Sequence, residues 1–184
     1  MGRGLAGFVR NCAPGPGAAL EGSPKPVIGS RWAPGGSLAV AFTCRECGAV
    51  YDLDSESCAS RFDALLALDH SRAEPWGSRH SLAFAAFALQ HPRRFPREVV
   101  ERAWILLLKV YREGEDHKRV TQALRQFGKQ NPNWGLPPLP AGEPDRGYGV
   151  TIASLGSFAP ETYSQKLDAW CRAALAGWCD PPEG

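Results

Sequence analysis

Three cysteines and one histidine in the first half of the chain have the types and spacing of ligands for one tetrahedral metal ion. Cys44 and Cys47 form a Cys-x-x-Cys pair directly before Gly48, and Cys58 and His80 follow further along. Structural zinc sites commonly use four cysteines, or three cysteines and a histidine. A glycine after the second cysteine suits such a knuckle because it can take the positive φ that the turn often needs. We therefore expect a zinc ion bound by Cys44, Cys47, Cys58 and His80.

Helix geometry guides the choice of the fourth ligand. Cys58 and His70 are twelve residues apart on one expected helix, which places them about 18 Å apart along its axis. They cannot share an ion. His80 starts the next expected helix, and it can reach Cys58 if the two helices pack side by side. His91 follows His80 by eleven residues, about 16 Å further along the same helix, so we exclude it from the metal that His80 binds.

The expected site has three possible chemical roles. Three thiolates and an imidazole fill a tetrahedron, which favours a structural zinc in a domain that acts through a protein partner or a small-molecule ligand. The alternative is a zinc-dependent, hydrolase-like enzyme in which water replaces one ligand, with His91 and Gln90 as candidate catalytic residues. If the zinc is structural, His91 can fix the turn at Pro92 by a hydrogen bond. The third possible role of the site is a redox Cys-x-x-Cys pair, but such a pair usually starts a helix in a βαβ unit.

Five helical patterns follow the Cys-x-x-Cys pair and must position these ligands. Apolar residues recur at helical spacing near residues 57–68, 78–91, 96–110, 116–128 and 160–178. Leu82 to Leu89 are eight consecutive apolar residues, and a helix that is apolar on all sides is normally the buried central one. The expected fold is mainly α, a small helical bundle of about five helices with an N-terminal zinc-knuckle-like segment.

The N-terminal segment has a different composition. Residues 1–36 contain nine glycines and five prolines, a composition that gains little from burial and loses much chain entropy on ordering. We therefore predict a disordered Gly/Pro-rich tail over residues 1–36 and a zinc-binding helical domain over residues 37–184.

Charge and hydropathy argue against several classes of partner. The formal net charge is +2, and no face gathers the lysines and arginines that a nucleic-acid partner requires. No apolar run approaches the roughly 20 residues of a membrane span, and no secretory signal is visible. We therefore expect a cytoplasmic protein, since a reducing compartment keeps a Cys-x-x-Cys pair available for metal.

The motifs together resemble an uncharacterised bacterial family of unknown function. The resemblance rests on the Cys-x-x-Cys-Gly knuckle, a third cysteine leading into Phe62-Asp63-x-Leu65-Leu66, and two histidines eleven residues apart that end in Gln-His-Pro. It covers residues from about 44 to the end of the chain. It implies no activity, but it implies that the matching motif positions are Cys44, Cys47, Cys58, His80, Gln90 and His91.

Overall fold

The computed structural model describes residues 41–52, 56–71, 73–126, 138–142, 144 and 147–179. All of them belong to one unit that runs from Val40 to Gly184. The predicted tail over residues 1–36 lies outside the described residues, so its disorder and the domain boundary at residue 37 stay predictions.

The fold is mainly α, as the sequence predicts. The described residues form five α-helices, which are α1 (Cys58–His70), α2 (Trp76–Gln90), α3 (Arg97–Tyr111), α4 (His117–Gln126) and α5 (Pro160–Cys179). Two short 3-10 helices accompany them: η1 (Pro92–Arg94) follows α2, and η2 (Ile152–Leu155) precedes α5. None of the described helices is both long and apolar enough to cross a membrane.

A small β-hairpin precedes the helices and corresponds to the predicted knuckle. Strands β1 (Phe42–Thr43) and β2 (Val50–Tyr51) pair in antiparallel fashion, with Phe42 opposite Tyr51 and Thr43 opposite Val50. The turn between the strands carries the Cys-x-x-Cys pair. Gly48 in this turn has a φ of +78°, the left-handed conformation expected of the glycine after the second cysteine.

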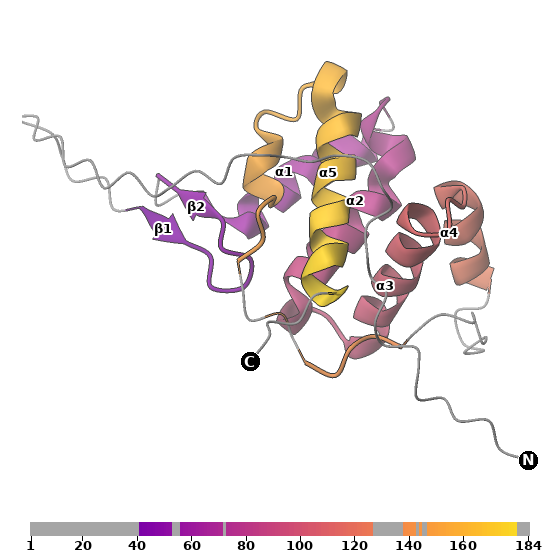
Figure 1. Cartoon of the computed structure of the whole chain (residues 1–184). Helices are drawn as coiled ribbons and strands as arrows, with labels where there is room; N and C mark the ends of the chain where they lie inside the picture. Colours follow the sequence, from indigo (N-terminus) through magenta and orange to yellow (C-terminus); the bar gives the residue numbers. More distant parts are fainter. Residues whose placement is uncertain are drawn as a thin grey trace, which may run out of the picture. The chain divides into compact units, whose positions relative to one another are not determined.

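Helix α2 is the central helix, as its apolar sequence predicts. It packs against α1, α3 and α5, and Figure 1 shows it behind α5, with α3 and α4 on one side and α1 on the other. Small side chains alternate with large ones along its buried faces, and the buried alanines are Ala83, Ala85, Ala86 and Ala88. Alanines on several faces let neighbouring helices approach closely, which explains how one helix accommodates three partners.

Helices α1 and α2 form an antiparallel hairpin that determines the geometry of the site. The Ser57 side chain caps α1 by accepting a hydrogen bond from the Ser60 backbone N–H at 3.1 Å. Only residues 71–75 connect the two helices, and so short a connection makes neighbouring helices antiparallel. The rings of Phe62 on α1 and Phe87 on α2 stack with their centroids 3.9 Å apart. The first turns of α1 therefore lie beside the last turns of α2.

Helix α5 packs against α2 through one apolar face. Its buried residues include Tyr163, Leu167, Trp170, Ala174 and Trp178. Two of its tryptophans are also bonded to the C-terminal end of α2. The Trp178 indole N–H donates to the Leu89 carbonyl at 2.9 Å, and the Trp170 indole N–H donates to the Gln90 side-chain oxygen at 2.8 Å. Packing and hydrogen bonds thus fix the end of α2 that approaches the knuckle.

Candidate metal centre

Three cysteines and one histidine meet in a buried cluster beside the knuckle. The ligand atoms of Cys44, Cys47, Cys58 and His91 all lie within 4.8 Å of one another. Cys44 Sγ is 3.8 Å from His91 Nε2, and Cys47 Sγ is 3.4 Å from Cys58 Sγ. Zinc bonds of about 2.0–2.3 Å separate tetrahedral ligands by roughly 3.4–3.8 Å. The cluster therefore has dimensions that fit one tetrahedral ion.

The fourth member of the cluster is His91, whereas the sequence prediction places His80 there. The antiparallel hairpin explains the difference. Cys58 is the first residue of α1, so its neighbour across the hairpin is the end of α2, where His91 lies. His80 belongs to the first turns of α2 and lies beside the end of α1, where its Nδ1 is 2.9 Å from Asp69 Oδ2. The prediction assumed that the starts of the two helices meet.

The knuckle turn holds its two cysteines by backbone hydrogen bonds. The Cys44 N–H donates to the Ala49 carbonyl at 2.8 Å, and the Gly48 N–H donates to the Cys44 carbonyl at 2.9 Å. A Cβ atom on Gly48 would lie 2.8 Å from Gly147 Cα, closer than non-bonded carbon atoms approach. Glycine is thus required twice at this residue, for its positive φ and for the contact with residue 147.

A hydrogen bond orients the imidazole of His91. Its Nδ1 is 3.1 Å from the Phe87 carbonyl oxygen, so this nitrogen carries the proton and donates it. The other nitrogen, Nε2, then presents a lone pair toward Cys44, as a metal ligand must. The Phe87 ring also stacks on the imidazole with centroids 4.2 Å apart. His91 is 0% exposed, so its orientation is set by the protein on every side.

The cysteines share protons unequally. A hydrogen bond from the Cys47 thiol lowers the pKa of Cys58 to about 4; burial opposes this shift, and hydrogen bonds involving His91 and Tyr51 support it. The Tyr51 hydroxyl donates to Cys58 Sγ at 3.2 Å. The same Cys47–Cys58 bond, together with burial, raises the pKa of Cys47. Two thiolates at this distance repel each other, and a cation between them removes that penalty.

An ion pair joins η1 to the knuckle turn. The Arg94 guanidinium lies 5.8 Å from the centroid of the Phe87 ring, and its Nε donates to a Glu46 carboxylate oxygen at 2.7 Å. Glu46 lies between the two cysteines of the knuckle turn, so this contact ties the turn to the segment that follows His91.

The three cysteines of the cluster form no disulfide bond. Cys44, Cys47 and Cys58 are all free cysteines, and 3.4 Å between Cys47 and Cys58 is well beyond an S–S bond of about 2.05 Å. Cys171 is buried on α5, where its thiol donates to the Leu82 carbonyl.

Gln90, the second candidate catalytic residue, is part of the core. It is 0% exposed. Its side-chain N–H donates to the Val150 carbonyl at 2.8 Å, and its oxygen accepts from Trp170 at the same distance. Each polar atom of the amide therefore has a partner, and the side chain joins α2, α5 and the segment before η2.

The sequence motifs do not identify Asp69, a buried charged residue. It is 6% exposed and bonded to His80. The available signal was the eleven-residue spacing between Asp69 and His80. Across a short helical connection, this spacing places the last turn of one helix beside the first turns of the next.

The comparisons with known proteins place the chain in a family. The model of the family of unknown function DUF5946 matches residues 42–179, so the chain belongs to that family, as the sequence motifs predicted. No curated protein and no solved structure matches the chain.

Proposed function

We propose that this member of the DUF5946 family binds one zinc ion through Cys44, Cys47, Cys58 and His91, and that the ion has a structural role. The observation that carries the proposal is the buried cluster of these four side chains, with all ligand atoms within 4.8 Å of one another. The domain would act as a metal-stabilised helical scaffold that binds a protein or small-molecule ligand.

The donor set favours zinc over other metals. Three thiolates and an imidazole in a tetrahedron suit zinc, whereas calcium and magnesium prefer oxygen ligands. A cytoplasmic location agrees with this chemistry, since a reducing compartment keeps the three thiols available.

Burial and connectivity favour a structural role over a catalytic one. Four ligands would complete a tetrahedral site, and the four side chains are at most 7% exposed, which leaves a substrate little access to an ion held between them. Two of the ligands come from the knuckle turn and two from the ends of the α1–α2 hairpin. An ion at this place would attach the β-hairpin to the helices, and its binding free energy would contribute to folding.

The alternative, a zinc-dependent hydrolase with His91 as a catalytic residue, has less support. Such a role requires a His91 nitrogen that faces a substrate. The two ring nitrogens instead face the Phe87 carbonyl and Cys44, and the side chain has no exposed surface.

Metal analysis combined with cobalt substitution tests the proposal. We expect one equivalent of zinc in the untagged protein, and loss of helical circular dichroism when a strong chelator removes it. Cobalt(II) in place of zinc should give the absorption of a tetrahedral thiolate site, and cyanide should leave this spectrum unchanged because no coordination position is open. Zinc well below one equivalent would refute metal binding, and a cyanide-dependent spectrum would refute the structural role.

A further inference from the structure

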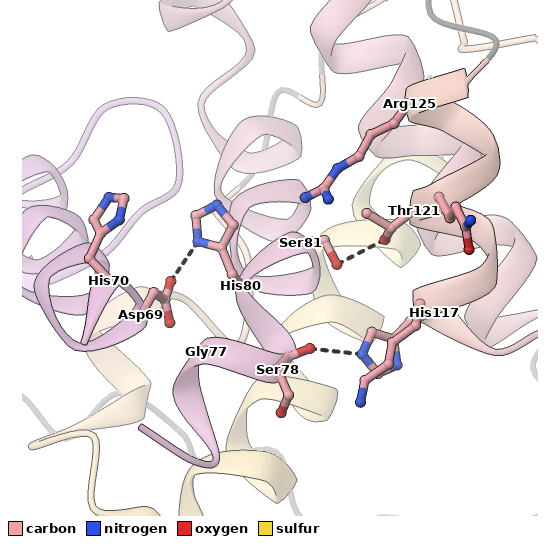
Figure 2. A pocket seen from close by; sticks show the side chains of 11 residues that line it. Asp69, His70, Gly77, Ser78, His80, Ser81, His117, Thr121 and Arg125 are labelled. Atoms are coloured by element: carbon pink, nitrogen blue, oxygen red, sulfur yellow. Dashed lines mark hydrogen bonds and ion pairs between the residues drawn. The ribbon is translucent and has the colours of Figure 1, made fainter. Parts of the chain in front are cut away.

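A second polar site lies at the opposite end of α2 from the cysteine cluster. An open pocket of about 620 Å³ is lined by the end of α1, the first turns of α2, and α4. The chain has four histidines, and the three outside the cysteine cluster, His70, His80 and His117, all line this pocket. Figure 2 shows that they come from three different helices. No feature of the proposed metal centre requires this grouping.

The carboxylate of Asp69 fixes the orientation of His80 in this pocket. Asp69 Oδ2 is 2.9 Å from His80 Nδ1, and the Asp69 side chain is 2% exposed while that of His80 is 39% exposed. The second carboxylate oxygen, Oδ1, is buried and has no hydrogen-bond partner within the described part of the chain. A buried carboxylate with so few partners is costly unless a hydrogen-bond donor lies beside it. The Nδ1–H of His80 is that donor.

His80 also has a second ring nitrogen. Its Nδ1–H donates to Asp69, so Nε2 remains available to a ligand in the pocket. Thr121 also donates to the Ser81 hydroxyl at 3.0 Å, so the Ser81 proton is available to another acceptor. The pocket floor therefore offers hydrogen-bonding groups from adjacent residues of α2.

Helix α4 adds positive charge from the other side. Arg125 extends from α4 toward the first turns of α2, as Figure 2 shows. It has no ion pair or hydrogen bond with any residue in the described ranges. Lys118 lines the same side. A guanidinium presents a planar set of N–H donors that matches two oxygens of a phosphate or carboxylate.

The charged residues that line the pocket are mostly cationic. Asp69 is the one carboxylate among the described residues that line it, and it is bonded to His80. The positive end of the α2 dipole also points to this region, because Gly77 and Ser78 of its first turn line the pocket. Lys118 and Arg125 thus give the lining an excess of positive charge, so the complementary ligand is an anion.

We propose that this pocket binds a small phosphorylated molecule, whose phosphate group accepts hydrogen bonds from Ser81 and Arg125 and lies beside Nε2 of His80. A phosphate directs its oxygens tetrahedrally and can reach groups on both helices, whereas the acceptor sites of a carboxylate lie in one plane. The volume of about 620 Å³ lies within the range of pockets that bind whole small molecules, so the rest of the ligand also fits. The site does not depend on the proposed metal centre.

A phosphate titration with two matched arginine variants tests the proposal. Imidazole resonances of the full chain, with its metal retained, are followed by NMR during addition of inorganic phosphate at constant ionic strength. We expect a saturable shift of the His80 resonances. Arg125→Ala should weaken binding about ten-fold, the typical effect of losing a charge-assisted hydrogen bond. Arg119→Ala is the control, because it removes the same charge from an exposed residue of α4 that does not line the pocket.

Each outcome bears on the assignment. An unchanged affinity in Arg119→Ala and a weakened one in Arg125→Ala would support it, as would weaker binding of acetate than of phosphate. Equal losses in the two variants would indicate general electrostatic attraction and would overturn the site. The phosphate assignment would also be wrong if phosphate did not shift the His80 resonances, or if acetate bound as tightly as phosphate. It would be wrong as well if added zinc, instead of phosphate, shifted the His80 resonances.

Discussion

Replacement of His91 or His80 gives the most direct test of the ligand set. The cluster contains His91 Nε2 at 3.8 Å from Cys44 Sγ, whereas His80 is bonded to Asp69. We therefore expect His91→Ala to lose zinc. His80→Gln should retain one equivalent, because its amide can still donate to Asp69 and no metal ligand is removed.

The structure also gives the size of the effect on stability. His91 is 0% exposed, and shortening a fully buried side chain to alanine costs about 2–5 kcal/mol. A loss of about 3 kcal/mol lowers the thermal midpoint of a domain of this size by roughly 9–12 °C. Loss of the ion would add to this decrease. For His80→Gln, a half-buried residue with a preserved donor, we expect less than about 1 kcal/mol.

The assay combines zinc quantification with thermal unfolding followed by circular dichroism. A third variant, His91→Cys, separates loss of a ligand from loss of packing. It offers a thiolate at the same place and completes a four-cysteine set, which zinc also accepts. We expect it to recover zinc that His91→Ala lacks. Zinc retained in His91→Ala and lost in His80→Gln would refute the assignment and restore His80 as the fourth ligand.

Three further predictions concern the knuckle and α4. Gly48→Ala should lower both zinc content and the thermal midpoint: a positive φ costs a non-glycine residue about 1–2 kcal/mol, and the new Cβ would lie 2.8 Å from Gly147 Cα. Cys58→Ser should lose zinc and aggregate on expression, which metal analysis and size-exclusion chromatography would measure. A zinc-loaded, fully helical variant would contradict the proposed ligand set. Asp116 accepts a hydrogen bond from the Arg119 N–H at 3.0 Å, which lowers the pKa of this carboxyl. A lowered pKa means that the contribution of Asp116 to the stability of α4 is complete above the ordinary value of 3.8 and is lost as pH falls below it. Amide hydrogen exchange in the first turn of α4 should therefore become faster at low pH. Asp116→Asn should remove this pH dependence.

The helices could be predicted from local sequence because their signals are local. Pro96 and Asp116 precede α3 and α4, and α5 begins at Pro160, as the sequence indicates. The spacing of Cys44 and Cys47 identifies half of the metal cluster for the same reason, since a turn of a few residues determines how two side chains converge.

The fourth member of the cluster depended on tertiary structure: the sequence analysis places His80 there, whereas the structure places His91. The distances along each helix were correct, and so was the conclusion that His80 and His91 cannot share an ion. What was missing was the direction in which the second helix returns. Five connecting residues make the helices antiparallel, so Cys58 faces the end of α2. The burial of Asp69 could not be predicted for the same reason, because its partner His80 belongs to α2 and meets it only when the two helices pack together.

The α1–α2 hairpin has a consequence for insertions and deletions in related chains. Removal of one residue within α2 would turn His91 by about 100° around the helix axis and shift it by about 1.5 Å, away from Cys44. Changes in the length of the connection 71–75 act at the other end, where Asp69 meets His80. Variation in the helix lengths thus affects the cysteine cluster, and variation in the connection affects the pocket. The two sites can therefore diverge separately, although one helix carries residues of both.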